Sequence, residues 1–168
     1  MRRSRAILVW VLIAAALAAI AQIMRPQRQP GAPVSGHARV VDGDSLEIAG
    51  QRIRIASIDA PERDQSCRTA DGKTYRCGEV AARALAEIIA RRVVTCIPLT
   101  HDRYDREVAV CTVDGRDLAE ALVRGGHALG YARSNRYAAA EREAREARRG
   151  LWAGSFESPA TWRRQNPR

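Results

Sequence analysis

The chain has 168 residues and a net charge of +9, and 27 of its 28 basic residues are arginine. This length suits one domain of ordinary size with short extensions and is short for two full domains. A hydrophobic fraction of 46% with 28% charged residues is typical of globular proteins, which excludes global disorder and fibrous repeats. The positive charge is compatible with binding to phosphates, but an arginine bias in genome composition would also produce it.

Residues 1–24 read as a targeting segment. A basic cluster at positions 2, 3 and 5 precedes an unbroken apolar run from Ala6 to Ala21. Ala19-Ile20-Ala21 resembles a signal-peptidase site, so a cleaved signal peptide and a retained membrane anchor both stay open. In either case the positive-inside rule predicts export of the rest of the chain, to the periplasm or the exterior. Residues 25–35 contain three prolines and read as a linker.

Most of the charge lies outside the predicted domain. Five arginines and no acidic residue precede position 36, and the segment 155–168, which reads as a basic C-terminal tail, adds +2. Residues 36–154 therefore carry only +2. The total charge therefore mainly reflects the N-terminal cluster that predicts membrane topology. The rest of the excess lies in the C-terminal tail, which is a candidate for membrane or nucleic-acid contact.

The domain begins with short runs that have the residue types and turn signals of strands. Three runs, separated by Asp42-Gly43-Asp44 and Gly50-Gln51, precede a helical pattern, and two more strands follow it. Asp117 is a predicted N-cap of a later helix. The predicted strands are 37–41, 45–49, 52–58, 93–99 and 107–113, and the predicted helices are 78–92, 117–124 and 137–149. Five short strands with a helix after the third predict an α+β, mainly β, chain: a five-stranded OB-fold barrel with three helices.

The chain has four cysteines and no C-x-x-C pair, which disfavours a zinc site. An even number in an exported protein favours disulfides over free buried thiols, although four free thiols remain the alternative. Cys96 and Cys111 flank a predicted hairpin turn symmetrically, and Cys67 and Cys77 bracket a polar loop. We therefore predict the pairs Cys67–Cys77 and Cys96–Cys111.

Two segments carry residues suited to phosphodiester chemistry. One comprises Val40 to Ser45 and Arg54 to Glu62, and it holds four carboxylates and Arg54 at the ends of neighbouring predicted strands; the other is Asp102-Arg103-Tyr104-Asp105-Arg106. Hard divalent cations take carboxylate oxygens, and arginines neutralise phosphate oxygens. Each element alone has an ordinary structural explanation, such as a hairpin turn at Asp42-Gly43-Asp44. Only the ordered combination indicates a phosphoryl-transfer site.

That combination resembles the staphylococcal nuclease-like (thermonuclease) family, over roughly residues 37–152. The elements that carry the resemblance are Val41-Asp42-Gly43-Asp44-Ser45, the Arg54 to Asp59 spacing, Asp59-Ala60-Pro61-Glu62, Asp102 to Arg106, Glu120 to Gly126 and Gly150-Leu151-Trp152. The resemblance implies Ca²⁺-dependent cleavage of DNA and RNA, single-stranded or denatured substrate being favoured, to leave 3′-phosphate ends.

The same resemblance implies roles for individual residues. Asp44, Asp59 and the backbone carbonyl of Ala60 would bind Ca²⁺, with Asp42 as a nearby carboxylate. Glu62 would orient or deprotonate the attacking water. Arg54 and Arg106 would bind the scissile phosphate and stabilise the transition state. Tyr104 and Tyr131 would contact substrate. Arg54 and Asp59 are an odd number of residues apart, so their cooperation requires a twist or bulge before Asp59.

The sequence thus favours an exported, monomeric calcium-dependent endonuclease, tethered to the membrane if the N-terminal segment is retained. The alternative is a non-catalytic OB-fold module that binds nucleic acid or protein in a periplasmic assembly. Two observations favour the enzyme. The two arginines and three principal carboxylates are all present, and aromatic residues, which sequence-tolerant single-strand binders use as stacking platforms, are only 5% of the chain.

Overall fold

The computed structural model describes residues 13, 15, 31–131 and 134–167. The predicted targeting segment lies outside these residues, apart from two isolated positions, as does most of the predicted linker. Within the described part of the chain, no helix has the length and apolar character needed to cross a membrane.

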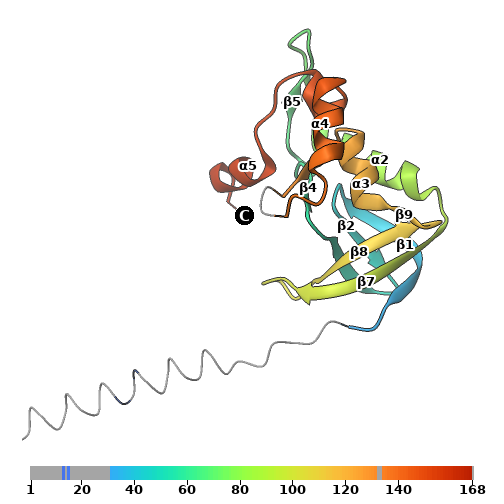
Figure 1. Ribbon diagram of the computed structural model, residues 1–168. Helices are drawn as coiled ribbons and strands as arrows, with labels where there is room; N and C mark the ends of the chain where they lie inside the picture. The colour runs from blue at the N-terminus through green and yellow to red at the C-terminus, as the bar shows by residue number, and fades with distance from the viewer. Residues whose placement is uncertain (1–12, 14, 16–30, 132–133, 168) are drawn as a thin grey trace, which may run out of the picture.

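Five strands form a closed barrel at one end of the described domain (Figure 1). They are β1 (Val34–Asp42), β2 (Ser45–Ile48), β3 (Gln51–Ile55), β7 (Val93–His101) and β8 (Glu107–Val113). The hydrogen-bonded order is β3-β2-β1-β7-β8, and parallel pairing of β3 with β8 closes the sheet on itself. This arrangement confirms the predicted OB-type barrel.

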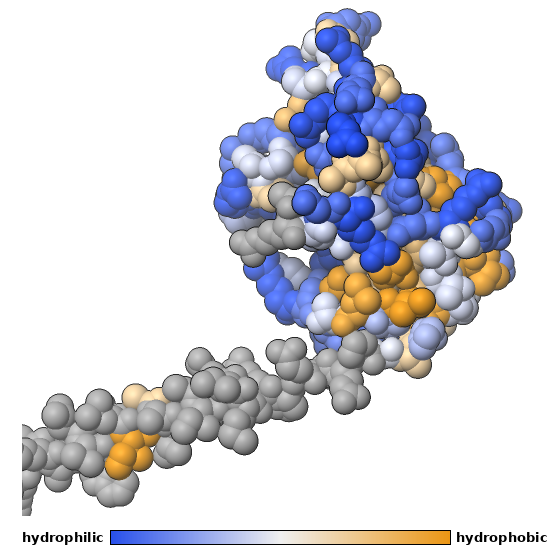
Figure 2. Space-filling model, in the orientation of Figure 1, coloured by the Kyte–Doolittle hydropathy of each residue, from blue (hydrophilic) through white to orange (hydrophobic). Residues whose placement is uncertain are grey.

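Alternation along the strands builds the barrel interior. On β3, Ile53 and Ile55 are buried while Arg54 between them points out of the core, and on β8 Ala109, Cys111 and Val113 are buried in alternate positions. Because successive side chains in a strand point to opposite faces, one face fills the core and the other is left for polar groups or solvent. The outer face of β7 exposes the hydrophobic side chains of Val93, Ile97 and Leu99. Figure 2 shows hydrophobic surface gathered at the barrel end and hydrophilic surface at the opposite end.

Four α-helices lie in the described part of the chain, one more than predicted. They are α2 (Cys77–Ile89), α3 (Leu118–Arg124), α4 (Ala138–Glu146) and α5 (Pro159–Gln165). Asp117 caps α3 as predicted, because its Oδ1 accepts hydrogen bonds from the backbone N–H groups of Ala119 and Glu120. Helix α4 ends three residues earlier than predicted and is followed by a 3₁₀ turn, Gly150–Ala153.

The additional helix, α5, corrects the interpretation of residues 155–168 as a tail. Ser158 caps the helix by accepting a hydrogen bond from the backbone N–H of Thr161, and Pro159 occupies the first turn. Proline is favoured there because its missing N–H would have no partner inside the helix. In Figure 1, α5 lies beside the short strand β4 and away from the barrel strands β7 and β8.

The predicted strand 52–58 is interrupted. Strand β3 ends at Ile55, Ser57 adopts a left-handed φ of +64°, and a short strand β4 (Ile58–Asp59) follows, paired with β10 (Leu129–Gly130). This is the change of direction that cooperation between Arg54 and Asp59 requires. The chain turns at Ser57, so that the two side chains meet.

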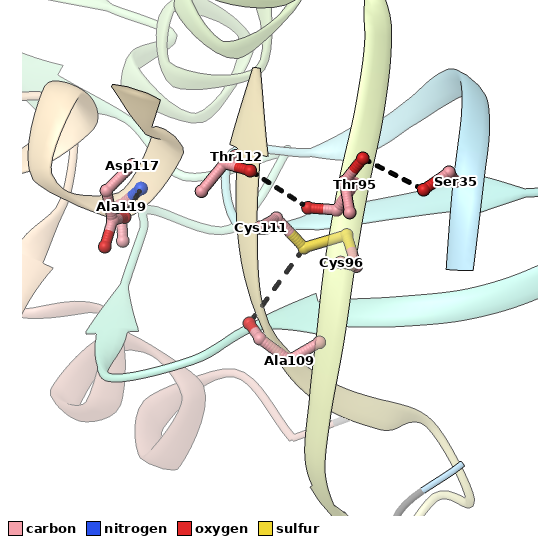
Figure 3. The surroundings of a disulfide bond; sticks show 8 residues. All are labelled: Ser35, Thr95, Cys96, Ala109, Cys111, Thr112, Asp117 and Ala119. Atoms are coloured by element: carbon pink, nitrogen blue, oxygen red, sulfur yellow. Dashed lines mark hydrogen bonds between the residues drawn. A yellow bond between two sulfur atoms is a disulfide. The ribbon is translucent and has the colours of Figure 1, made fainter. Parts of the chain in front are cut away.

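Both predicted disulfides are present. Cys96 on β7 and Cys111 on β8 are register partners, and their disulfide joins the two strands inside the barrel (Figure 3). Cys67–Cys77 joins the start of a two-stranded loop, β5 (Cys67–Arg68) with β6 (Thr74–Tyr75), to the start of α2. It packs in a second, smaller cluster with Leu151 and Phe156. Strand β9 (Arg116–Asp117) pairs antiparallel with the end of β8, directly before α3.

Candidate active site

An open cleft of about 960 Å³ lies where one end of the barrel meets α5. Its walls come from the β1–β2 turn, the end of β3, the β7–β8 turn, the segment after β4, and α5. The lining residues that bear charge or an aromatic ring are Asp42, Arg52, Arg54, Glu62, Asp102, Arg103, Tyr104, Arg106, Tyr131, Trp162 and Arg163. Asp44 and Asp59 lie beneath this surface and are 4% and 5% exposed.

Arg54 connects the two buried carboxylates. Its Nη2 lies 2.8 Å from Oδ2 of Asp44 and 3.0 Å from Oδ1 of Asp59, and 3.4 Å from the hydroxyl of Tyr131. One nitrogen thus holds residues from three separate segments, which is possible because the turn at Ser57 directs Asp59 back toward β3. Burial is tolerated because each carboxylate has a cationic partner.

Asp44 is the most strongly perturbed acid of the cleft. Burial raises its pKa, the guanidinium of Arg54 lowers it, and the neighbouring Asp42 raises it again, with a resulting pKa of about 7. Its oxygens accept hydrogen bonds from the hydroxyl of Ser45 at 3.0 Å and from the backbone N–H of Ala60 at 3.2 Å. The second of these places the backbone of Ala60 directly against Asp44.

The tight β1–β2 turn that presents Asp42 and Asp44 depends on Gly43. A Cβ at this position would lie 2.7 Å from the Cβ of Ala81 and 2.8 Å from the Cβ of Ala60. The glycine therefore lets the turn approach both α2 and the Asp59-Ala60 segment. Close approach, as well as turn propensity, explains the residue at this position.

The β7–β8 turn places Arg106 at the cleft. Asp102 accepts hydrogen bonds from the backbone N–H groups of Tyr104 and Arg106 and from Nε of Arg106 at 2.7 Å. Burial alone would raise the pKa of Asp102, but these hydrogen bonds outweigh it and lower that pKa. Nη1 of Arg106 reaches the hydroxyl of Ser45 at 3.3 Å, which is the residue bonded to Asp44. The guanidinium of Arg106 lies over the exposed ring of Tyr104, with its central carbon 5.6 Å from the ring centroid.

Glu62 is positioned through buried Gln65. The backbone N–H of Glu62 donates to Oε1 of Gln65, and Nε2 of the same side chain donates to the carbonyl of Glu157, 2.9 Å away. Gln65 is 0% exposed, so this amide fixes the Glu62 segment to the chain just before α5. Gly78 at the start of α2 lies against the same segment, since its Cβ would fall 1.8 Å from the carbonyl oxygen of Glu62.

Arg163 on α5 is a site residue that the sequence did not predict. Its Nη1 lies 2.9 Å from Oδ1 of Asp59 and 2.8 Å from Oε1 of Glu62, and its Nη2 lies 3.0 Å from Oδ2 of Asp59. The Ser158-Pro159 pair is a recognisable helix start that could have revealed α5. No local pattern indicates that a side chain of this helix contacts Asp59, because the two residues are 104 positions apart.

The structure brings most of the predicted site residues to one place. Arg54 contacts Asp44, Asp59 and Tyr131, and Asp42 accepts a hydrogen bond from the backbone N–H of Asp44. Glu62, Tyr104 and Arg106 line the same cleft. Their roles in binding and chemistry stay predictions.

The donor set suits a hard cation in chemical type: two buried carboxylates with the Ala60 backbone beside one of them. In the part of the chain that the structure describes, no group of three or more His, Cys, Asp or Glu side chains is gathered tightly enough to form a metal site. Cationic guanidinium groups from Arg54 and Arg163 contact the carboxylates instead. The negative charge of the two buried carboxylates is therefore balanced by these arginines.

Comparison with known proteins gives a consistent result. The family model described as "Staphylococcal nuclease homologue" matches residues 52–154, more than half of the chain. The "Succinoglycan biosynthesis protein ExoI" of Rhizobium meliloti (strain 1021) is 39% identical over 149 residues, covering 86% of this chain and 77% of that protein. An "Uncharacterized endonuclease" of Escherichia coli O157:H7 is 31% identical, covering 74% and 81%. The "Staphylococcal-like nuclease CAN1" of Arabidopsis thaliana is 31% identical, covering 75% of this chain and 38% of that protein.

Proposed function

Because the chain belongs to the staphylococcal nuclease homologue family, we propose that it is a Ca²⁺-dependent endonuclease that hydrolyses phosphodiester bonds of DNA and RNA and leaves 3′-phosphate ends. The observation that carries the proposal is the meeting of Asp44, Arg54 and Asp59 within hydrogen-bonding distance beneath a cleft lined by Glu62 and Arg106.

The residues of the cleft divide the chemistry among them. Arg54 and Arg106 enter from β3 and from the β7–β8 turn, so two guanidinium groups are available to bind the scissile phosphate and stabilise the added charge of the transition state. Glu62 is held by its backbone hydrogen bond to Gln65, and it would orient the attacking water and accept its proton. Asp44, Asp59 and the Ala60 carbonyl would hold Ca²⁺, which supplies Lewis-acid stabilisation of the phosphate when bound.

The shape of the cleft supports a single-stranded or denatured substrate. The cleft is open and is lined by exposed Tyr104 and Tyr131 as well as the arginines. Exposed rings offer surfaces on which unpaired bases can stack, whereas paired bases stay inside a duplex. We infer that Tyr104 and Tyr131 contact the nucleotides beside the cut.

We also infer that the domain acts outside the cytoplasm as a monomer, and is tethered to the membrane if its N-terminal segment is retained. The basic cluster followed by an apolar run supports export. Two disulfides support it independently, because such bonds persist in oxidising compartments.

The decisive experiment incubates the purified full chain with denatured DNA in the presence of Ca²⁺ or of a chelator. We expect cleavage with Ca²⁺, products carrying 3′-phosphate, and no cleavage with chelator. Glu62→Gln tests the active site in the same assay and should remove most of the activity while the circular dichroism spectrum is unchanged. Binding of the DNA without cleavage under any of these conditions would instead support the non-catalytic binding module.

A further inference from the structure

Helix α5 contributes to the cleft although it lies outside the residues matched by the family model. The match ends at residue 154, and α5 begins at Pro159. Trp162, Arg163 and Asn166 of this segment line the cleft beside the residues assigned to catalysis. The site therefore includes residues from an element that lies beyond the matched segment.

Arg163 engages the two acidic residues that the proposed chemistry most needs. Both of its terminal nitrogens bond to Asp59, one to each carboxylate oxygen, and one of them also bonds to Glu62. A two-pronged guanidinium–carboxylate contact is among the strongest hydrogen-bonded ion pairs in proteins. The partners raise the pKa of Arg163 further above its ordinary value against the opposing effect of burial, so the group stays cationic at any working pH.

The backbone that carries Arg163 is fixed at several points. Ser155 forms a pair of backbone hydrogen bonds with Arg68, next to the Cys67–Cys77 disulfide, and the carbonyl of Glu157 accepts from buried Gln65. Pro159 is buried at the first turn of α5. These contacts present Arg163 to the cleft in a defined place, so its contacts with Asp59 and Glu62 are a built feature of the fold.

The side chain of Arg163 is freer to leave than that of Arg54. Arg54 is 14% exposed and comes from a barrel strand, whereas Arg163 is 36% exposed and extends from a helix of seven residues. Rotation of Arg163 toward the open cleft requires no change in the barrel. Of the two arginines on Asp59, the one from α5 is the exchangeable partner.

We propose that Arg163 is a built-in competitor for the cation of this site and a determinant of its metal affinity. The proposal rests on the proposed function, in that Asp59 is taken as a cation ligand. A cation approaching Asp59 finds both oxygens already bonded to a guanidinium and binds only the fraction of molecules in which Arg163 has moved away. The apparent dissociation constant is the intrinsic constant divided by that fraction. Arg163 therefore raises the concentration of Ca²⁺ at which the site fills.

The test is calorimetric titration of the full chain with Ca²⁺, without substrate. We expect Arg163→Gln to bind Ca²⁺ at least about tenfold more tightly than the unaltered chain, which corresponds to a site free about a tenth of the time. Arg163→Lys, which keeps the charge and loses the two-pronged contact, should fall between them. Arg164→Gln is the matched control. Arg164 is the next residue of α5 and bonds to Thr161 within the helix, so its replacement should leave the affinity for Ca²⁺ unaltered.

Asp59→Asn separates failure of this proposal from failure of the proposed function. If the unaltered chain binds Ca²⁺, Asp59→Asn abolishes binding and Arg163→Gln changes nothing, competition is refuted while the cation site stands. Weaker binding by Arg163→Gln would also overturn the proposal and would make Arg163 a support of the site. If neither the unaltered chain nor Arg163→Gln binds Ca²⁺, both proposals fail. Binding of Ca²⁺ by Arg163→Gln but not by the unaltered chain would be the strongest confirmation that Arg163 competes with the cation.

Discussion

Asp59 is held from two sides, by the barrel and by the C-terminal segment, and the two sides are built differently. Arg54 reaches Asp59 from strand β3, where the flanking residues Ile53 and Ile55 are each 1% exposed and belong to the main core. Arg163 reaches it from α5, which is anchored by a few hydrogen bonds and the small cluster around Cys67–Cys77. The barrel side therefore provides permanent geometry, and the C-terminal side provides a contact that can be exchanged.

The largest expected effect comes from the barrel side. Arg106→Ala should lower kcat by about 10²–10³, because removal of one preorganised donor to a developing negative charge typically costs that much. Steady-state kinetics on denatured DNA with saturating Ca²⁺ measure the change, and thermal denaturation shows whether the fold persists. A loss below about tenfold would refute the role assigned to Arg106. Arg116→Ala, on strand β9 and outside the residues that line the cleft, is the matched control.

The titration of Asp44 tests how strongly the barrel side excludes water from this carboxyl group. Its pKa rises from 3.8 to about 7, so the folded state binds a proton more strongly than the unfolded chain does. In chelator, the stability from this group is fully present below about pH 4 and declines as the pH rises toward 7, with an upper bound of about 4 kcal/mol. Thermal denaturation from pH 4 to pH 8 measures the slope. Asp44→Asn should remove this contribution; the same slope in that variant would assign it to other groups.

The two disulfides offer a matched comparison of the two sides. They close segments of similar size, with sequence separations of 10 and 15, so replacing either pair by alanine should cost about 3 kcal/mol of unfolding free energy. Denaturant titration measures that cost. Only the loss of Cys67–Cys77 should loosen α5, and it should therefore tighten Ca²⁺ binding in the direction expected for Arg163→Gln. An equal change in affinity after loss of Cys96–Cys111 would contradict the division into two sides.

Gly78→Ala probes the junction between the two sides. The added Cβ would fall 1.8 Å from the carbonyl oxygen of Glu62, so α2 or the Glu62 segment must shift. The three nearest atoms belong to the backbone, so we expect a cost at or above the upper end of the roughly 1–3 kcal/mol that overpacking typically causes. We expect a loss of kcat as well, because Glu62 moves with its backbone. Ala86→Gly, at an exposed position of the same helix, is the control. It should lower the free energy of unfolding by about 1 kcal/mol through helix propensity and leave kcat unchanged.

Features carried by neighbouring residues could be predicted from the sequence. The strand runs, the capping Asp117, the hairpin that brings Cys96 to Cys111 and the motif residues from Asp42 to Glu62 were all found this way and are present. Even the need for a bend before Asp59 followed from the odd spacing of Arg54 and Asp59. The physical reason is that strand alternation, turns and caps are set by residues a few positions apart.

The tertiary structure alone decided what meets at Asp59. The sequence indicated a basic tail, but Arg163 in that segment contacts a carboxylate 104 positions away. Buried Gln65, which bonds to the backbone of Glu62, also contacts Glu157, 92 positions from Gln65. Such contacts depend on how the barrel, the disulfide-linked loop and α5 pack together, which no local pattern encodes. The sequence thus determined the barrel and the chemical types of its site residues, whereas packing decided that α5 forms a wall of the cleft.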